Sequence, residues 1–403
     1  MTLTSDAVQT HSGSVAERLE LLPPVVDTLR AADALAEADR VLQHAEVRAL
    51  RDIGVLNLRI PTQYGGPGGS IRDVVSVVIQ IASGSSNVAQ ALRAHFGFLE
   101  RLLSNRATEA ERQEWFPRIN AGLVVGNAIT DAVGRVPGSS GTTLSLDDAG
   151  VLRLNGHKFY STGTLYADVI AVSAVNADGN DVQAVVPTDR AGVELFDDWH
   201  GFGQRTTASG STRFTDVAVE PFEVITVSDG KQLGHGTAFL QLYLAAVAAG
   251  IAAAVRADAV DFVRHRARPA AHSLADRASA DPFILRAVGE ISAWAAAART
   301  VVLSAADELD ALVDGGLQAD DAAVGAVAVA VAEAQLVAER FTVAAAERLF
   351  DTGGASATSR ALNLDRHWRN VRTVASHSPL DYKAHAAGDF AVNGTVPPNS
   401  GYF

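Results

Sequence analysis

The chain contains no cysteine among its 403 residues. Disulfides, thiolate nucleophiles and cysteine-based metal sites are therefore excluded, and we predict no metal site. Positive charge is scarce, because 33 Lys and Arg residues stand against 46 Asp and Glu residues, for a formal net charge of −13. Nucleic-acid binding requires a basic surface that neutralises phosphates, so this charge argues against a nucleic-acid partner.

Long uninterrupted apolar runs are also missing. The first 15 residues are polar, and the later apolar stretches are broken by small or charged residues. A membrane-spanning helix needs about 20 predominantly apolar residues. We therefore expect a cytoplasmic protein with no membrane partner. Its hydrophobic fraction of 48% is enough for a large core, spread over two or three domains at roughly 100–200 residues each.

The spacing of the apolar residues changes twice along the chain. Residues 1–122 have a helical period, residues 123–230 have a period of two with turn residues between short runs, and residues 231–403 are alanine-rich and helical again. This pattern predicts an α+β, mostly α, protein with an N-terminal helical domain, a central antiparallel β-barrel and a C-terminal helical bundle. Helices this apolar exceed what one bundle can cover, so we expect subunit contacts.

The stretch from Asn155 to Val172 combines a turn, aromatic residues and hydroxyls. Asn-Gly between apolar runs is typical of a hairpin. Tyr160, Ser161 and Thr162 then precede an apolar strand. Small donors beside aromatic rings suit a flat ligand, although a β-turn at a strand start explains the same residues.

Two neighbouring stretches leave the same two interpretations open. Asn127 and Thr130 open the β region with side chains that can bond the polar edge of a heteroaromatic ring. Trp199 and Phe202 lie among small residues, which suits a flat ligand and equally suits a barrel rim.

Two histidines are candidates for proton transfer near neutral pH. His95 lies among apolar residues of a predicted helix, and His377 precedes Ser378-Pro379 at a helix boundary. A lone histidine on an apolar face is more often a core residue whose two nitrogens find partners. From these residues alone, both interpretations remain open.

The order of a helical third, a β third and a long-helix third resembles the acyl-CoA dehydrogenase fold along essentially the whole chain. Three short motifs agree: 61–66 resembles the Pro-x-x-Tyr-Gly-Gly turn of that family, 128–131 its Thr-Glu loop beside the flavin, and 158–163 the segment that touches the isoalloxazine. Each motif alone is weak evidence for the family, but all three occur in the right order along the chain, which makes the evidence stronger. The resemblance implies a flavin site, a C-terminal four-helix bundle and a homotetramer.

The dehydrogenases of this family need a carboxylate to remove a proton next to a thioester carbonyl. The two places where the resemblance allows that base are 371–380 and 230–256, and neither contains Asp or Glu. Proton removal from so weak an acid requires a positioned acceptor. An FAD-dependent acyl-CoA dehydrogenase is therefore an alternative and not the main hypothesis.

Where the sequence departs from the dehydrogenases, it resembles the flavin monooxygenase branch of the same fold. This branch includes dibenzothiophene monooxygenase and related sulfone and amine oxygenases. The similarity implies a catalytic set of His95, Asn127, Ser161 and His377. It implies a substrate pocket of Leu92, Phe96 and Phe98. The implied flavin-binding residues are Asn127, Thr130, Tyr160, Ser161, Thr162, Trp199, Arg266, Arg268, Ala355, Ser356 and His377.

The resemblance further implies a two-component enzyme. A separate NAD(P)H-dependent flavin reductase supplies reduced flavin, which reacts with O₂ to give a C4a-hydroperoxide. Its oxygen passes to a small apolar organosulfur or similar heteroatom substrate, and amine N-hydroxylation is the alternative within the branch. Ser161 and Asn127 are suited to donate to flavin N5 and the peroxide, and His95 and His377 to carry protons.

The cofactor is expected to be FMN, with FAD as the alternative. The FAD-binding Gln-x-x-Gly-Gly-x-Gly turn of the dehydrogenases is matched by 350–356, with Phe350 in place of Gln and Ser356 in place of the last Gly. The adenosine half thereby loses a donor. Arg266 or Arg268 resembles the arginine that reaches a neighbouring subunit's flavin phosphate. No Gly-x-Gly-x-x-Gly follows a strand, so no nicotinamide site is visible.

Overall fold

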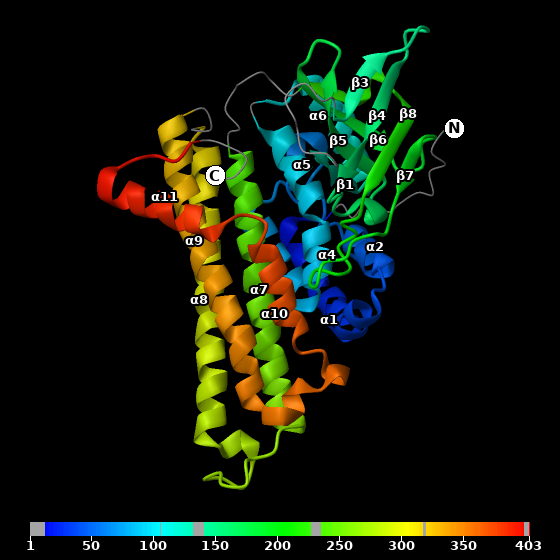
Figure 1. Ribbon diagram of the computed structural model, residues 1–403. Helices are drawn as coiled ribbons and strands as arrows, with labels where there is room; N and C mark the ends of the chain where they lie inside the picture. Colours follow the sequence, from blue (N-terminus) through cyan, green and yellow to red (C-terminus); the bar gives the residue numbers. More distant parts are fainter. Residues whose placement is uncertain (1–12, 105, 132–140, 227–234, 317–319, 399–402) are drawn as a thin grey trace.

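The structure is a computed structural model that describes residues 13–104, 106–131, 141–226, 235–316, 320–398 and 403. Short helices precede a twisted sheet, and long helices follow it (Figure 1). The helices of the first third are α1 Val15–Asp39, α2 His44–Asp52, α3 Ile71–Gly84, α4 Ser86–Ala91, α5 Arg93–Leu103 and α6 Glu109–Asn120.

Helix α1 contains Pro23 and Pro24, although proline inside a helix usually breaks or kinks it. Proline at these positions removes only the hydrogen bonds to the carbonyls of residues 19 and 20. Residue 20 is exposed and residue 19 is half-buried, so water can replace the lost donors. The helix begins with a capping box between Ser14 and Glu17, which fixes its start.

The strands of the central third are β1 Val125–Ala128, β2 Thr130–Asp131, β3 Thr143–Leu146, β4 Leu152–Phe159, β5 Val169–Asn176, β6 Asp181–Pro187, β7 Val193–Leu195, β8 Thr212–Val219 and β9 Val224–Thr226. They form one sheet in the order β7-β8-β4-β3-β5-β6-β9, with β1 paired to β5 and β2 to β4. Inward side chains such as Leu154, Ile170 and Phe214 form a separate small core.

The sheet is mixed, so the prediction of a purely antiparallel barrel was wrong. Strands β1 and β3 each run parallel to β5. Antiparallel pairing follows directly only where a short hairpin joins two strands. Strand β5 is separated in sequence from both partners by β4, so no hairpin dictates their relative direction.

The last third is built on three long helices, α7 Gly236–His265, α8 Pro282–Asp314 and α9 Asp321–Arg348. They lie side by side, with α10 Arg366–Ala375 along α7 and α9, and α11 Leu380–Asn393 crossing α9 at the left of the view (Figure 1). This arrangement confirms the predicted helical bundle. Helix α3 packs against α7 and joins the first third to the same core.

Among the described residues, α7 and the helical segment 321–352 are long and apolar enough to pass as membrane spans by composition. The most apolar window of α7 is 89% buried within the protein, so α7 is a core helix. The corresponding window of 321–352 is only 50% buried. An apolar helix face left half uncovered by its own chain is typical of a subunit contact.

The helix-to-strand change falls between Asn120 and Val125, where we expect the first domain limit. The later change from strand to helix falls between Thr226 and Gly236. The limit expected at residues 230 and 231 lies outside the described residues.

Candidate active site

In the turn after β4, the side chain of Tyr160 points outward and the side chain of Ser161 points inward. Tyr160 has a left-handed backbone with φ of 54° and an exposed ring, whereas Ser161 is fully buried. The backbone N–H of Ser161 donates to the carbonyl of Gly210 (2.9 Å), and that of Gly163 donates to the carbonyl of Thr207 (3.0 Å). Residues 160–163 are therefore fixed against a second loop, 204–210.

The Oγ of Ser161 is buried and has no hydrogen-bond partner among the described residues. Each such buried group costs about 1–3 kcal/mol, and native proteins contain few of them. Further buried polar atoms without a partner come from the second loop, from α4 and from the start of β8. They are Gln204 Oε1, Thr206 Oγ1, Asn87 Nδ2, Gln90 Oε1 and Thr212 Oγ1. Their grouping indicates the binding site of a ligand with a polar edge.

Helix α4 holds the second loop in place. The backbone N–H of Thr206 donates to the Oδ1 of Asn87 (3.0 Å), and Nε2 of Gln204 donates to the hydroxyl of Ser86 (3.0 Å). Gln90 lies three residues after Asn87 and thus on the same face of the helix. Gln90 was not among the residues predicted from sequence. Nothing in the local sequence shows that this face of α4 packs against the second loop.

The junction of α4 and α5 connects the Ser161 loop to His377. Gly163 has φ of 82°, and a Cβ built on it would lie 2.3 Å from the carbonyl oxygen of Ala91, so only glycine fits there. Two residues after Ala91, Nη1 of Arg93 lies 3.3 Å from Nε2 of His377. The structure thus brings the predicted residues Ser161 and His377, from different thirds of the chain, to the two sides of one short segment.

The imidazole of His377 is a neutral hydrogen-bonding group in this setting. Arginine can only donate, so Nε2 accepts from Arg93 and the ring proton lies on Nδ1, 3.4 Å from the Ser378 hydroxyl. Desolvation by the surrounding protein, followed by the positive charges of Arg93 and Lys383, lowers the pKa of His377 to about 4. Near neutral pH the ring therefore carries one proton, at Nδ1, which faces the Ser378 hydroxyl.

His95 makes structural contacts through both of its ring nitrogens. Its ring is fully buried in α5. Nδ1 accepts from the backbone N–H of Val125 (3.2 Å), and Nε2 lies 2.8 Å from the carbonyl oxygen of Leu56, to which it donates. Both nitrogens are used, so neither is left for a flavin or a substrate. Burial lowers the pKa of His95 to about 4, so the ring stays neutral.

We expect His95→Gln to change the pH dependence of stability and to leave flavin chemistry unchanged. The folded state resists protonation of His95 down to about pH 4, whereas the unfolded chain protonates it near pH 6.5. The unfolded state binds more protons in this window, so the unfolding free energy falls as pH falls, by up to about 3 kcal/mol. Urea unfolding at several pH values should show a shallower slope for the variant. An unchanged slope, with the exposed His265→Gln as control, would contradict this role.

The other predicted flavin contacts of the β region lie around the Ser161 loop. Asn127 is half-buried on β1, and its backbone N–H lies 3.5 Å from the carbonyl oxygen of Thr162. The hydroxyl of Thr162 is 2.9 Å from that of Ser209. The indole of Trp199 stands edge-on to Tyr160, with 6.0 Å between ring centroids. Thr130 pairs with Phe159 at the exposed end of β2.

Asp131 follows Thr130 and is not a free base. Its carboxylate binds the buried Nζ of Lys158 (2.7 Å) and the hydroxyl and backbone N–H of Thr142. Burial raises the pKa of Asp131, but these bonds outweigh it and keep the pKa below its ordinary value. Among the other buried carboxylates in the described part of the chain, Glu37 and Glu100 are bound by arginines. Glu339 of α9 instead accepts from the amide of Gln335 (2.8 Å), and burial raises its pKa to about 7.

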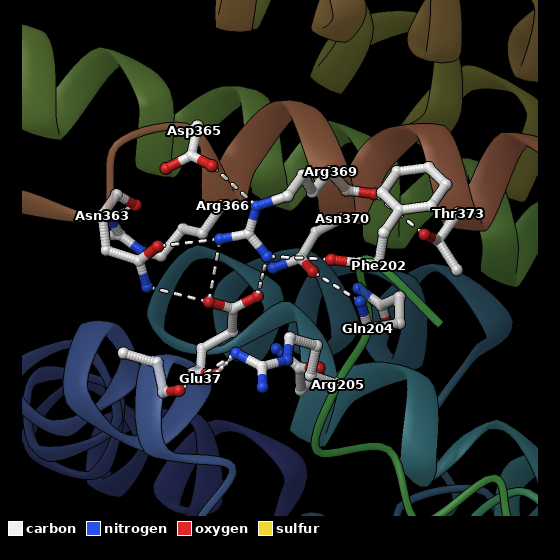
Figure 2. Close-up of polar contacts among 12 residues, drawn as sticks. Glu37, Phe202, Gln204, Arg205, Asn363, Asp365, Arg366, Arg369, Asn370 and Thr373 are labelled. Carbon is white, nitrogen blue, oxygen red and sulfur yellow. Dashed lines mark hydrogen bonds and ion pairs between the residues drawn. The ribbon is translucent and has the colours of Figure 1, made fainter. Parts of the chain in front are cut away.

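Helix α10 anchors the second loop, a function that sequence reasoning did not assign. In Figure 2 the guanidinium of Arg369 faces the carboxylate of Glu37 from α1 and also donates to the carbonyl of Phe202 (2.9 Å). The backbone N–H of Gln204 donates to the Oδ1 of Asn370 (2.6 Å). Arg205 donates back to the carbonyl of Glu37 (2.8 Å). The loop beside Ser161 is thereby tied to both helical thirds.

Four predicted cofactor residues lie far from this site within one chain. Arg266 and Arg268 follow α7, and Ala355 and Ser356 lie in the short helix Gly354–Thr358. All four are exposed. They lie at the opposite end of the helical bundle from β1 and α5 (Figure 1). One chain therefore does not bring them to its own Ser161.

The residues predicted to line the substrate pocket lie in the protein interior. Leu92, Phe96 and Phe98 are all buried in the main core. Phe98 packs edge-on against Trp115 of α6 (5.7 Å), and Phe96 packs against Tyr243 of α7 (5.9 Å). Both rings contribute to the core, and their part in a substrate pocket stays a prediction. Leu92 lies at the α4–α5 junction, beside Arg93.

Comparison with known proteins gives consistent matches over the chain. The model of the acyl-CoA dehydrogenase N-terminal domain matches residues 21–123, and that of the acyl-CoA dehydrogenase C-terminal domain matches residues 242–382. A probable FMNH2-dependent monooxygenase SfnC of Pseudomonas putida is 33% identical over 89% of this chain and 90% of its own. Dibenzothiophene monooxygenase of Rhodococcus qingshengii is 30% identical over 88% of each chain.

Two solved structures are similar across nearly the whole chain. FMN-bound TdsC from Paenibacillus sp. A11-2 superposes with a TM-score of 0.87 at 28% identity, covering 96% of this chain and 100% of its own. The methanesulfinate monooxygenase MsuC from Pseudomonas fluorescens gives a TM-score of 0.82 at 31% identity, covering 94% and 99%.

Proposed function

The chain belongs to the flavin-dependent monooxygenases of the acyl-CoA dehydrogenase family, and from this premise we propose that it uses reduced FMN and O₂ to oxygenate a small organosulfur compound. One observation carries the proposal: the buried Oγ of Ser161 has no partner in the described part of the chain. A donor held in this way, in a loop fixed from several sides, suits the polar edge of a flavin ring.

The residues around Ser161 fit FMN. Asn127 and Thr162 extend the polar edge, and the exposed ring of Tyr160 beside Trp199 offers apolar surface to a flat ligand. When bound in its reduced form, FMN supplies the two electrons that O₂ activation requires. Ser161 donates a hydrogen bond to the ring edge, and the packed loops keep water out, which suppresses loss of the oxidising equivalents as H₂O₂.

His377 contacts Arg93, the first residue of α5, and would donate from Nδ1 to a ligand by exchanging its contact with the Ser378 hydroxyl (3.4 Å). Its neutral form keeps a second positive charge away from Arg93. An atom with a lone pair, such as sulfur, attacks an electrophilic oxygen without first losing a proton. The paired state of Asp131 therefore supports oxygenation over dehydrogenation, which needs a free carboxylate.

The same reasoning supports a homotetramer. The most apolar window of 321–352 is only 50% buried, and a neighbouring subunit can cover its partly buried residues. Arg266, Arg268, Ala355 and Ser356 are exposed at the far end of the bundle, where they can reach the flavin phosphate of a neighbouring subunit. We further propose that a separate NAD(P)H-dependent flavin reductase supplies the reduced FMN, and that the enzyme is cytoplasmic.

Two glycines give a matched test of the FMN site. Gly163 and Gly179 share φ of 82°, but a Cβ on Gly163 meets the carbonyl of Ala91 whereas Gly179 has nothing within 4 Å. Alanine at either position costs about 1 kcal/mol of backbone strain. We expect Gly163→Ala to weaken FMN binding at least about tenfold, since it displaces the Ser161 loop, and Gly179→Ala to leave it unchanged.

Fluorescence titration with FMN and FAD measures both affinities directly. The proposal predicts tighter binding of FMN than of FAD. It is contradicted if FAD copurifies with the chain and is bleached anaerobically by an acyl-CoA, or if the wild type binds neither flavin.

A further inference from the structure

Glu339 is a fully buried carboxylate of α9 that the proposed reaction does not use. Its Oε1 accepts from the side-chain amide of Gln335 (2.8 Å), which is also fully buried. Its Oε2 is buried and has no hydrogen-bond partner within the described part of the chain. A buried carboxylate is costly unless hydrogen bonds or an opposite charge compensate it. The cations near Glu339 therefore decide its charge state.

Two cations from neighbouring helices act on Glu339, and they flank His377 in the sequence. Arg372 of α10 is half-buried, and Lys383 of α11 is only 2% exposed, with its Nζ 4.3 Å from the ring centroid of Phe403. Burial raises the pKa of Glu339 to about 7, and the positive charges of Lys383 and Arg372 act in the opposite direction. Burial lowers the pKa of Lys383 to about 8, against the charge of Glu339.

The other surfaces packed around this part of α9 add no compensating charge. Helix α7 has no charged residue from Gly236 to Val255, and the buried residues of α8 are all apolar. Glu333 and Arg340 on α9 itself are exposed. On α10, Arg366 and Arg369 bind carboxylates of α1 and α7. In α11, whose residues are all described, Lys383 alone is buried.

The link between α10 and α11, residues 376–379, carries His377 between the two cations. The backbone N–H groups of Ser376 and His377 donate to the carbonyls of the last turn of α10 (3.2 and 3.0 Å). An ionised Glu339 attracts one cation from each helix and so holds both ends of the link against α9. A neutral Glu339 leaves only like charges around His377, since Arg93 lies on its other side.

We propose that Glu339 is a positioning residue, whose charge holds the link 376–379 in place and thereby fixes the His377 imidazole for oxygen transfer. The part that concerns oxygen transfer rests on the proposed function, whereas the order of the link does not. Because the pKa of Glu339 is about 7, the link is ordered above neutral pH and looser below it.

Hydrogen exchange of the full-length protein without flavin tests the order of the link. The amides of Ser376 and His377 are followed by mass spectrometry at pH 6 and pH 8. Glu339→Gln keeps the oxygen that accepts from Gln335 but removes the charge. At pH 8 these amides should exchange about tenfold faster in the variant, within the usual range of coupling between two sites. At pH 6, where the wild-type carboxylate is protonated, both proteins should exchange equally.

Two further variants separate charge from folding. Glu333→Gln changes an exposed glutamate of the same helix and should match the wild type at both pH values. Lys383→Met removes the cation of α11, so Glu339→Gln should loosen the link less in this background than in the wild type.

Global stability should respond to pH in the opposite direction. The folded protein keeps the proton of Glu339 up to about pH 7, whereas the unfolded chain releases it near pH 4.3. The native state binds more protons in this window, so the unfolding free energy falls as pH rises through it. Urea unfolding of Glu339→Gln should show a flatter fall. A glutamate with a purely structural role would change link order and stability in the same direction.

Turnover adds a second readout. Product and H₂O₂ formed per FMNH₂ oxidised are measured with methanesulfinate and with dibenzothiophene. The share of product should rise from pH 6 to pH 8 in the wild type and in Glu333→Gln. Glu339→Gln should lack this rise.

The outcomes distinguish this inference from the function beneath it. If Glu339→Gln exchanges like the wild type at pH 8, or equally faster at both pH values, the charge of Glu339 does not hold the link and the inference is wrong, while the monooxygenase stands. If the link responds as expected but the wild type binds no FMN, the proposed function fails. The role of Glu339 in oxygen transfer then fails with it, and the charge-dependent order of the link remains.

Discussion

Arg369→Met is expected to lower the unfolding free energy by about 3–5 kcal/mol, the typical loss when one partner of a buried ion pair is removed. The carboxylate of Glu37 is fully buried, and the guanidinium of Arg369 contacts both of its oxygens. Methionine fills much of the same volume, but within the described part of the chain it leaves that carboxylate with the amide of Asn363 alone. Urea unfolding followed by circular dichroism measures the loss.

The same substitution removes the donor to the carbonyl of Phe202, so FMN affinity should fall together with stability. A double variant, Glu37→Leu with Arg369→Met, should recover most of the stability, because no charge is then left without a partner. If the single substitution costs less than about 1 kcal/mol, as an exposed ion pair does, then Arg369 does not anchor the loop. Arg286→Met is the exposed control.

Ser161→Ala is expected to reduce product formation about 10²–10³-fold, the usual effect of removing one preorganised donor. Reduced FMN should still be consumed, with H₂O₂ released in place of product. Stability should be unchanged or slightly higher, because the Oγ of Ser161 makes no hydrogen bond within the described residues and alanine removes an unsatisfied group. The readouts are product and H₂O₂ formed per FMNH₂ oxidised.

Loss of activity with unchanged stability is expected for a residue whose hydrogen-bond partner is a bound ligand. Ser83→Ala serves as the control, because the Ser83 hydroxyl donates to the carbonyl of Gln80 at the end of α3, away from the loops. If Ser161→Ala yields as much product per FMNH₂ as the wild type, the assignment of Ser161 to the flavin is wrong.

Local patterns predicted the parts of this protein that depend on neighbours in sequence. The helical and strand periods placed the three regions, but the hairpin turn expected at Asn155-Gly156 was wrong, because both residues lie inside β4. The β-turn, one of two interpretations of Tyr160-Ser161-Thr162, lies at the end of β4, where Gly163 has the positive φ that turns favour. The mixed sheet could not be predicted from local sequence, since the β1–β5 pairing joins strands more than 40 residues apart.

The roles of the charged and polar residues depended on distant contacts. His95 lies among apolar neighbours in sequence, but its partners Leu56 and Val125 come from other segments 39 and 30 residues away. Arg93 next to it suggests an ordinary solvated helix position, whereas in the structure it reaches His377, 284 residues later. The 366–370 stretch is rich in charged and polar residues, and only the fold shows that Arg369 and Asn370 hold the second loop.

The most direct test of the central claim is oxygen labelling during turnover. Chemically reduced FMN and ¹⁸O₂ are supplied to the enzyme with methanesulfinate and, separately, with dibenzothiophene, and the products are analysed by mass spectrometry. A reduced-FMN-dependent monooxygenase places one ¹⁸O atom in the oxidised organosulfur product for each substrate molecule converted. Recovery of all the label as H₂O₂ with both compounds, together with anaerobic reduction of bound flavin by an acyl-CoA, would contradict it and favour a dehydrogenase.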